Sequence, residues 1–499
     1  MKKTLILMAL AAAGNAFAGG LLTNTNQNAA FLRNMAQDGT ITPTSIYANP
    51  AGGAFLSPGW HLSINSQTAI QERNISTTFP LFQLNKDNPS QTHEFKGDAQ
   101  APIIPSVTLS YNRDKWSLSA HFGLVGGGGK CEFYDGLGSF EALYSGSLYR
   151  QIPGLVNAQL PGIVASGLAA NGIPEPLASA LASPGNATYG SRLTGYGLDS
   201  YMRGRSYYFG LQVGGTYKFL AGLAGYVGLR GVYATCNYLG YVQDVVARYA
   251  YQYSVPADAA SGFPGTDGGG TGEGSLSGNM LSLNCDQTGF GVTPIVGIDW
   301  EINKHWNVAA KYECPTVMKL RNKSQMNNFA KSQAADPENV LSQFEDGKRV
   351  REDIPGILTL GVQYSPVSEV RLSGGFHEYF DKAAEKYGGK QNDISHNTCE
   401  FNFGAEYDVC RLITVSASWQ TTQYGMSDNY MNDLSFNLSN HMIGGGVRIH
   451  PSKYFNIDLG YMHTFYGSRD VVTPTSIGDK TDHYVRKNDV VGIGFNLYM

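Results

Sequence analysis

The sequence predicts an all-β protein, a 14-stranded antiparallel transmembrane β-barrel with an N-terminal hatch inside its lumen. Three observations favour this class. An export signal precedes the mature chain, many segments alternate apolar and polar side chains, and the connections between these segments are alternately short and long. The 61 glycines, 30 tyrosines and 23 phenylalanines, with only 15% charged residues, suit a sheet that faces lipid and carries aromatic girdles.

The N-terminus has the parts of a secretory signal peptide, which we expect to be residues 1–18. Lys2 and Lys3 are basic, residues 5–13 are apolar, and residues 16–18 read Ala-Phe-Ala, a small-residue cleavage pattern. We therefore expect export to the outer membrane of a Gram-negative cell. No later segment reaches the roughly 18 consecutive apolar residues of a transmembrane helix, so we expect none. The net charge of −4 argues against a nucleic-acid partner.

Alternation with a period of two is the signal for the strands. Apolar side chains occupy every second position from Trp116 to Leu124, and the same pattern recurs from Ile413 to Gln420. In a barrel, one set of side chains faces lipid and the other faces the lumen. The predicted strands lie near residues 60–72, 100–112, 115–125, 204–219, 223–245, 278–301, 304–322, 350–365, 368–381, 394–407, 411–425, 434–450, 453–467 and 483–499.

The connections between these strands fall into two classes. Six are short turns, which in bacterial barrels face the periplasm, whereas the longer connections face outward. The largest is expected to run from about residue 126 to residue 203. A soluble sandwich has no reason to alternate loop lengths in this way. The short turns are expected at residues 112–115, 219–222, 301–305, 365–369, 407–411 and 450–453.

Roughly forty residues separate the cleavage site from the first strand at Trp60. They are rich in Asn, Gln, Gly and Pro, and a barrel of this width has an open lumen unless something fills it. We therefore divide the chain into a signal peptide (1–18), a hatch (19–59) and a barrel (60–499). The alternative for residues 19–59 is a disordered periplasmic tail.

Several residues in order along the chain resemble the FadL family, whose members include transporters of long-chain fatty acids and aromatic hydrocarbons. Asn49-Pro50-Ala51, at the family's usual distance from the mature N-terminus, is similar to the N-terminal hatch of that family. Residues 105–107, 115–117 and 353–355 are further similar features. The resemblance implies a 14-stranded barrel, hatch residues Asn49, Pro50 and Ala51, and a ligand site near the N-terminus, for which Leu21 and Leu22 are candidates.

The resemblance also implies that an apolar ligand leaves, without ATP, through a sideways opening beside a kink in the third strand. Gly126, Gly127 and Gly128 directly follow the third-strand pattern and are the candidates for this kink, because glycine bends or interrupts a strand. The alternative is that the glycine run simply begins a flexible loop.

The largest loop contains apolar clusters where surface loops are usually polar. One short helix is predicted to begin near Pro161 and a second near Pro174. An exposed apolar face there would capture a hydrophobic solute, with Arg192, Arg203 or Arg205 as candidates to contact a headgroup. The alternative is that the helices pack on each other as a cap over the barrel mouth. The candidate ligand-binding residues are Ile163, Val164, Leu168, Leu177 and Leu181.

Six cysteines in an exported chain suggest disulfides. Cys236 and Cys285 lie on strands that should form a hairpin, and an antiparallel register places them opposite each other if its midpoint is near residue 260. The other four give no pairing and no zinc signature, so no metal or cofactor is expected. The glycine-rich segment 268–274 is interpreted as a linker.

The function predicted from these observations is passive outer-membrane transport of hydrophobic small molecules such as long-chain fatty acids. A general porin or a receptor or adhesin remains an alternative. An enzyme is disfavoured, because no Gly-x-Ser-x-Gly elbow is present. Expected partners are the hydrophobic solute, outer-membrane lipid, lipopolysaccharide and, through the final strand ending at Met499, the barrel assembly machinery. We expect a monomer.

Overall fold

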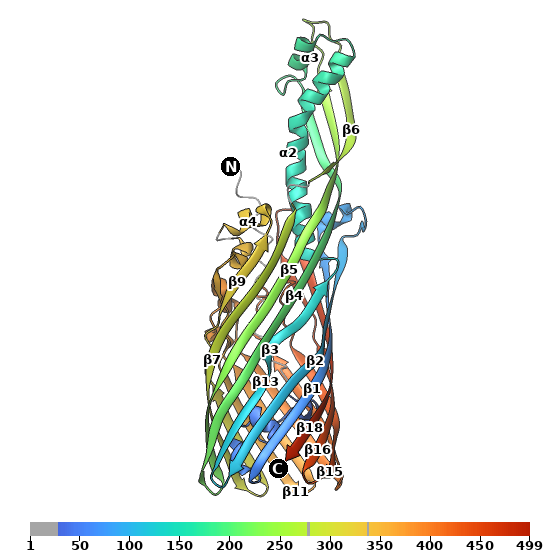
Figure 1. Cartoon of the computed structure of the whole chain (residues 1–499). Coiled ribbons are helices and arrows are strands. Elements are labelled where there is room, and N and C mark those ends of the chain that lie inside the picture. The colour runs from blue at the N-terminus through green and yellow to red at the C-terminus, as the bar shows by residue number, and fades with distance from the viewer. Residues whose placement is uncertain (1–27, 277–279, 337–338) are drawn as a thin grey trace.

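The chain forms one closed antiparallel barrel (Figure 1). The structure is a computed structural model that describes residues 28–276, 280–336 and 339–499. The barrel closes because β1 pairs with both β2 and β18. Its strand segments are β1 Gly59–Thr78, β2 Thr92–Arg113, β3 Trp116–Phe133, β4 Thr188–Leu220, β5 Leu223–Val255, β6 Thr266–Ser275, β7 Leu281–Asn303, β8 Trp306–Glu313, β9 Lys319–Met326, β10 Arg349–Arg351, β11 Ile357–Val367, β12 Val370–Tyr379, β13 Thr398–Cys410, β14 Ile413–Gln423, β15 Asn440–Ser452, β16 Phe455–Tyr466, β17 Arg469–Thr473 and β18 Lys480–Tyr498.

These segments make fourteen wall strands, as predicted, because four of the strands are interrupted. β6 and β7 both pair with β5, and β16 and β17 both pair with β18. β8 and β9 both pair with β7. On their other side, β9 pairs with β10 and β8 pairs with β11. Each of these four pairs of segments is therefore one barrel strand with a break in its upper part.

The two faces of the wall differ as the alternation predicts. In β3, Leu118 and Phe122 point outward and are 56% and 41% exposed, whereas Ser117 and His121 point inward and are 1% exposed. The outer face is therefore apolar enough to meet lipid, and the inner face is polar. The six short turns all lie at one end of the barrel, at the positions expected from the sequence (Figure 1, lower end).

A long projection rises from the opposite end (Figure 1). It consists of α2 (Gly138–Ala170), α3 (Glu175–Leu181) and the extended ends of β4, β5 and β6. The predicted loop of residues 126–203 is therefore wrong at both limits, because β3 continues to Phe133 and β4 begins at Thr188. The predicted start of a helix at Pro161 is also wrong, since α2 begins at Gly138 and runs through Pro153 and Pro161. α3 matches the second predicted helix.

Among the described residues, α2 is long and apolar enough to cross a membrane. The expectation that no such helix follows the signal peptide is therefore wrong by length and composition. In this fold, however, α2 lies in an outer connection and packs on β4 and β5. Its buried residues form a stripe that includes Leu148, Ile152, Val156 and Leu160, which explains why a helix of this apolarity is needed there.

The glycine-rich segment is a strand, not the linker expected from its composition. Residues of β6 pair with β5 so that Gly268 lies opposite Tyr253 and Gly272 lies opposite Tyr249. A Cβ atom at Gly268 would lie 2.4 Å from the Tyr253 ring. The glycines therefore leave space for tyrosine rings that lie across them, and this packing compensates for their poor strand propensity.

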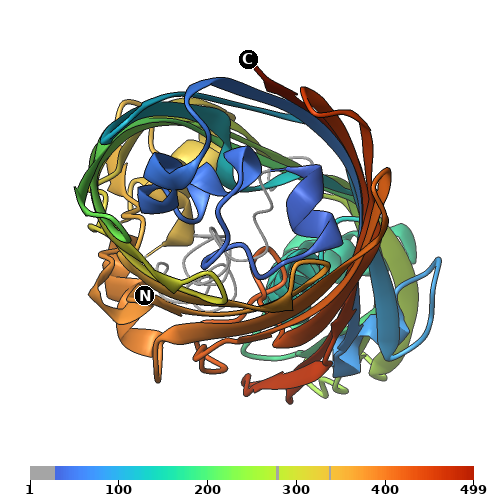
Figure 2. The same cartoon turned by 90° about the horizontal axis from the view of Figure 1, so that it is seen from below.

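The first described residues, 28–58, lie inside the barrel (Figure 2). Helix α1 (Ala29–Arg33) contacts β15, β16 and β18, whereas the 3-10 helix η2 (Ala51–Phe55) contacts β4, β5 and β7. With η1 (Pro43–Tyr47) between them, they form a hatch across the lumen. The signal peptide and the candidates Leu21 and Leu22 lie outside the described residues. Short helices in the outer connections are η3 Pro80–Leu84, α4 Asn328–Ala334, η5 Val340–Phe344, η6 Asp381–Ala383 and η7 Tyr387–Asp393.

Candidate functional site

The Asn-Pro-Ala triplet attaches the hatch to one side of the wall. Nδ2 of Asn49 donates a hydrogen bond of 2.5 Å to Oδ2 of Asp299 on β7. The carbonyl of Pro50 accepts a hydrogen bond of 3.1 Å from Thr216 on β4, and Ala51 is 1% exposed. The three residues are therefore anchors of the hatch in this structure.

Arg33 attaches the hatch to the opposite side. Its guanidinium group lies 2.5 Å from Oε1 of Glu406 on β13 and 3.1 Å from Oδ1 of Asp458 on β16. It also donates a hydrogen bond to the Ser416 hydroxyl on β14. Arg33 is 1% exposed, so these contacts are shielded from bulk water. The hatch is thus held by buried polar contacts at both ends.

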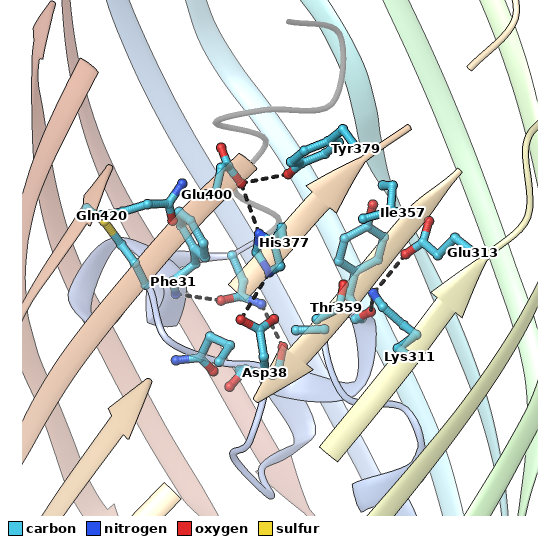
Figure 3. Close-up of a pocket in the computed structure, with 16 residues that line it drawn as sticks. Phe31, Asp38, Lys311, Glu313, Ile357, Thr359, His377, Tyr379, Glu400 and Gln420 are labelled. Carbon is cyan, nitrogen blue, oxygen red and sulfur yellow. Dashed lines mark hydrogen bonds and ion pairs between the residues drawn. The ribbon is translucent and has the colours of Figure 1, made fainter. Parts of the chain in front are cut away.

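A pocket lies between the hatch and the wall formed by β8 and β11 to β14 (Figure 3). Its cavity volume is about 70 Å³. Apolar side chains line it together with charged and amide groups, as expected of a site for a largely apolar molecule. The lining residues are Asn28, Phe31, Met35, Gln37, Asp38, Thr44, Tyr47, Ala48, Lys311, Glu313, Ile357, Thr359, His377, Tyr379, Glu400 and Gln420.

A series of side-chain hydrogen bonds crosses this pocket (Figure 3). The two ring nitrogens of His377 lie 3.0 Å from Oδ2 of Asp38 on the hatch and 2.9 Å from Oε2 of Glu400 on β13. The Tyr379 hydroxyl donates a 2.6 Å hydrogen bond to the same Glu400 oxygen. His377 therefore links the hatch to the wall.

Tyr47 of the hatch lies beside a second charged group. Glu313 on β8 lies 2.5 Å from Arg230 and 2.8 Å from Lys311, and both cations face the Tyr47 ring at 4.6 Å and 5.2 Å from its centroid. Burial raises the pKa of the Tyr47 hydroxyl to about 12. Both cations beside the pocket thus already have a carboxylate partner.

The pairing between β2 and β3 is interrupted over several residues, and we call this interruption the gap. Pairing stops above Val107 and Phe122 and resumes only at Gln100 and Lys130, so residues 101–106 and 123–129 do not pair across this seam. Pro102 and Pro105 lie in the β2 part and have no N–H to donate. A ladder that is interrupted at this level of a barrel is tolerated only where the strands line a cavity or a water-filled space.

The glycine run lies inside β3 and forms one edge of this gap. Gly127 has φ +113°, and a Cβ atom there would lie 2.4 Å from the carbonyl oxygen of Ser206 on β4. The pairing of β3 with β4 also shifts at Gly126 and again at Gly129. The alternative that residues 126–128 begin a flexible loop is therefore wrong, because β3 continues for several residues beyond them. Gly128 lies within the same irregular stretch.

A second, apolar pocket lies at the outer mouth. It lies between α2, β5, β7 and α4 with a cavity volume of about 160 Å³, and none of its lining residues is charged. We call it the outer groove. It is lined by Leu143, Tyr144, Ser147, Leu148, Gln151, Val245, Leu276, Leu281, Phe329 and Gln333. The sequence interpretation missed these residues because it began the helix at Pro161 rather than at Gly138.

The five predicted capture residues lie elsewhere, at the far end of the projection. Val164, Leu168 and Leu181 are buried in a small core with Phe263, and Leu177 packs against them. Ile163 is 53% exposed. The two helices therefore pack on each other, as the alternative interpretation had it, but they stand above the barrel rather than capping its mouth (Figure 1).

The predicted disulfide is not formed. Cys236 and Cys285 are both free and buried. The register pairs Cys236 with Gln287 and Cys285 with Tyr238, so the two cysteines are offset by two residues. β6 pairs with β5 about the midpoint deduced from the sequence, with Val246 opposite Ser275. Two extra residues between Ser275 and Leu281 then shift β7 by two positions against β5.

No protein-family model and no curated protein sequence matches this chain. Solved structures, in contrast, do match this chain. A FadL homologue of Pseudomonas aeruginosa superposes with a TM-score of 0.60 at 13% identity, over 96% of this chain and 99% of that one. The chain has the FadL fold. A mutant of the TodX monoaromatic hydrocarbon channel matches with a TM-score of 0.51 at 11% identity, over 94% of this chain and 98% of that one. The FadL fold therefore extends over the whole described barrel and its hatch.

Proposed function

We propose that this protein is an outer-membrane channel for hydrophobic small molecules such as long-chain fatty acids. The observation that carries the proposal is the gap in the wall beside a lumen that a hatch occupies. We propose that a solute in this lumen leaves sideways between β2 and β3, where the pairing of the two strands is interrupted. The similar structures are described as a FadL homologue and a monoaromatic hydrocarbon channel, which supports this class of substrate.

The proposed route begins at the outer groove. Its uncharged lining provides a site for an apolar chain, and transfer of each CH₂ group from water contributes about 0.8 kcal/mol. The solute then reaches the luminal pocket, where Phe31, Met35 and Ile357 are the larger apolar residues of the lining. It leaves through the gap, whose edge carries the exposed Ile103. Diffusion down a gradient needs no ATP at any of these steps.

The hatch distinguishes this proposal from a general porin. Arg33 and Asn49 fix it at opposite sides of the lumen, so a hydrophilic solute has no open central path along the barrel axis. We propose that the hatch residues around Asn49, Pro50 and Ala51 shift when ligand binds, opening the way from the luminal pocket to the gap.

Uptake by whole cells tests the proposal. Cells without their own hydrophobic-solute channel would produce this protein and receive labelled oleate, labelled toluene or labelled arabinose. We expect faster uptake of at least one of the two hydrophobic solutes and no change for arabinose. Faster arabinose uptake would instead support a porin, and surface-bound label that never enters the cell would support a receptor.

A further inference from the structure

Two arginines face each other on the inner wall without a carboxylate. Arg73 on β1 and Arg486 on β18 are directly opposite in the register. Side chains at such positions have Cβ atoms about 5 Å apart, and like charges there are destabilising. Both residues belong to the inward-facing sets, since their neighbours two positions above, Ile75 and Tyr484, are buried in the lumen.

The partners of these arginines do not neutralise them. Nε of Arg73 donates a 2.9 Å hydrogen bond to Gln71, and the Arg486 guanidinium lies 5.0 Å from the centre of the Tyr466 ring. Nε of Arg486 is buried without a hydrogen-bond partner. In the part of the chain that the structure describes, neither arginine forms an ion pair. Residues 1–27 contain no Asp or Glu that would supply one.

Other buried cations of the lumen are different. Arg33, Arg230 and Arg448 each lie within 3.1 Å of a carboxylate oxygen, and Lys311 lies 2.8 Å from Glu313. Arg73 and Arg486 are half-buried, and they stand out from this pattern because neither has a carboxylate partner in the described part of the chain. Two guanidinium groups side by side match the geometry of an anion with two or more oxygens.

The position of the pair suits a headgroup that travels with an apolar chain. Four residues below Arg73, Ala69 packs with Val490 against Leu32 and Met35 of the hatch. This is about 13 Å along the strand, less than the length of an extended long-chain fatty acid. Above the pair is the apolar cluster that includes Ile75 and Tyr484.

The pair is also close to the gap. Arg73 lies opposite Gly97 on β2, three residues above Gln100, where pairing with β3 stops.

We propose that Arg73 and Arg486 together bind the carboxylate of an apolar solute inside the lumen, above the gap between β2 and β3. The proposal rests on the proposed transport function and adds that an acidic amphiphile is a substrate class. The apolar chain of such a solute lies toward the hatch while its carboxylate bridges the two guanidinium groups. Arg192 and Arg205, two of the three arginines considered from the sequence, are exposed on β4 and have no part in this site.

The test is a binding titration of the full-length protein in a neutral detergent with dodecanoate and with methyl dodecanoate, which has no charge. The variants are R73Q, R486Q and the double variant. K487Q is the matched control, because Lys487 is the next residue on β18, is exposed, and loses the same charge. The folded state of each variant is checked by its heat-modifiable migration in gel electrophoresis.

We expect each arginine variant to bind dodecanoate roughly tenfold more weakly, with methyl dodecanoate binding unchanged and K487Q like the wild type. R73K, which keeps the charge but not the planar fork, should fall between R73Q and the wild type. Equal dodecanoate binding by the wild type and the folded double variant would overturn the headgroup site alone. If the wild type binds neither compound, the proposed function fails together with this site.

Discussion

Asn49 and Asp299 join the hatch to the barrel wall through one buried hydrogen bond of 2.5 Å. The same Asp299 oxygen accepts a 2.9 Å hydrogen bond from Asn307 on β8, whose amide also donates to the carbonyl of Gly39. The contact between hatch and wall is therefore a small network of amides around one carboxylate, and every member is buried. Removing either asparagine side chain leaves the Asp299 carboxylate with one hydrogen-bond donor fewer.

Asn49→Ala should loosen the hatch. Loss of the amide leaves Asp299 short of a donor, which costs on the order of 1–3 kcal/mol at a buried site. We expect a higher ion conductance in planar bilayers, because the hatch leaves its closed position more often. Asn88→Ala is the control, since Asn88 is exposed in an outer loop. A conductance equal to that of the wild type would show that Asn49 does not hold the hatch.

Arg33→Met should release the other end of the hatch while the barrel stays folded. Glu406 and Asp458 keep Arg371 and Arg448 as partners, so the loss is expected near the lower end of the range for a buried ion pair, about 3 kcal/mol. Proteinase K should then cleave the hatch while the barrel keeps its heat-modifiable migration.

The control for this variant is Arg411→Met, in an exposed turn. Equal protease resistance of the hatch in Arg33→Met and in the control would contradict the role of Arg33 as an anchor.

Gly127→Ala should reduce transport by disturbing the edge of the gap. The backbone there has φ +113° and lies too close to Ser206 for a methyl group, so β3 must shift. We expect oleate uptake to fall several-fold with an unchanged amount of assembled protein. Gly215→Ala on β4 is the matched control, because its Cβ would be in ordinary contact at 3.5 Å. If both variants transport oleate like the wild type, the gap between β2 and β3 is not the exit.

Phe329→Ser should weaken capture at the outer groove. Removing a phenylalanine from an apolar site costs about 1.5–3 kcal/mol, or roughly a tenfold loss of affinity or more. We expect slower uptake at low oleate concentration and normal uptake at saturation. Leu155→Ser, at a position of α2 that is 50% exposed, is the control and should have no effect. A matching loss in the control would point to α2 in general rather than to the groove.

Asp381 should make the loop between β12 and β13 less stable at high pH. Burial raises the pKa of this carboxyl to about 7. Because the folded state binds the proton more tightly than the unfolded state, stability is fully present below the unfolded pKa near 4 and is lost as the pH rises through about 7. The loop should be cleaved by protease faster at pH 8 than at pH 5.

Asp381→Asn keeps an acceptor for the backbone N–H of Thr398 and removes the titration. Cleavage of this variant should no longer differ between pH 5 and pH 8. A pH difference as large as in the wild type would assign the effect to another group.

The fourteen strands and their short turns could be predicted because both depend on local patterns. The alternation alone shows that Leu118 faces lipid and Ser117 faces the lumen. Turns such as the one before Trp116 lie where the alternation stops. The interruptions inside four strands could not be predicted in this way, because the segments on either side of each break pair with the same neighbouring strand.

The candidate site was less predictable because its contacts join residues far apart in the chain. His377 meets Asp38, and Arg33 meets Glu406 and Asp458, across more than three hundred positions. The outer groove was missed because Pro161, which lies inside α2, was interpreted as a helix start. The Asn-Pro-Ala triplet and the glycine run were found only through the family resemblance, which carried information that spacing alone did not.

The route through the wall is the central claim, and photo-crosslinking tests it most directly. A palmitate analogue with a diazirine at the end of its chain would be given to cells that produce the wild-type protein, and the labelled residues would be identified by mass spectrometry. We predict labels at the outer groove, in the luminal pocket and along residues 101–106 and 123–129. Labels confined to the outer groove, with none in the lumen or at the gap of a correctly assembled barrel, would contradict the account.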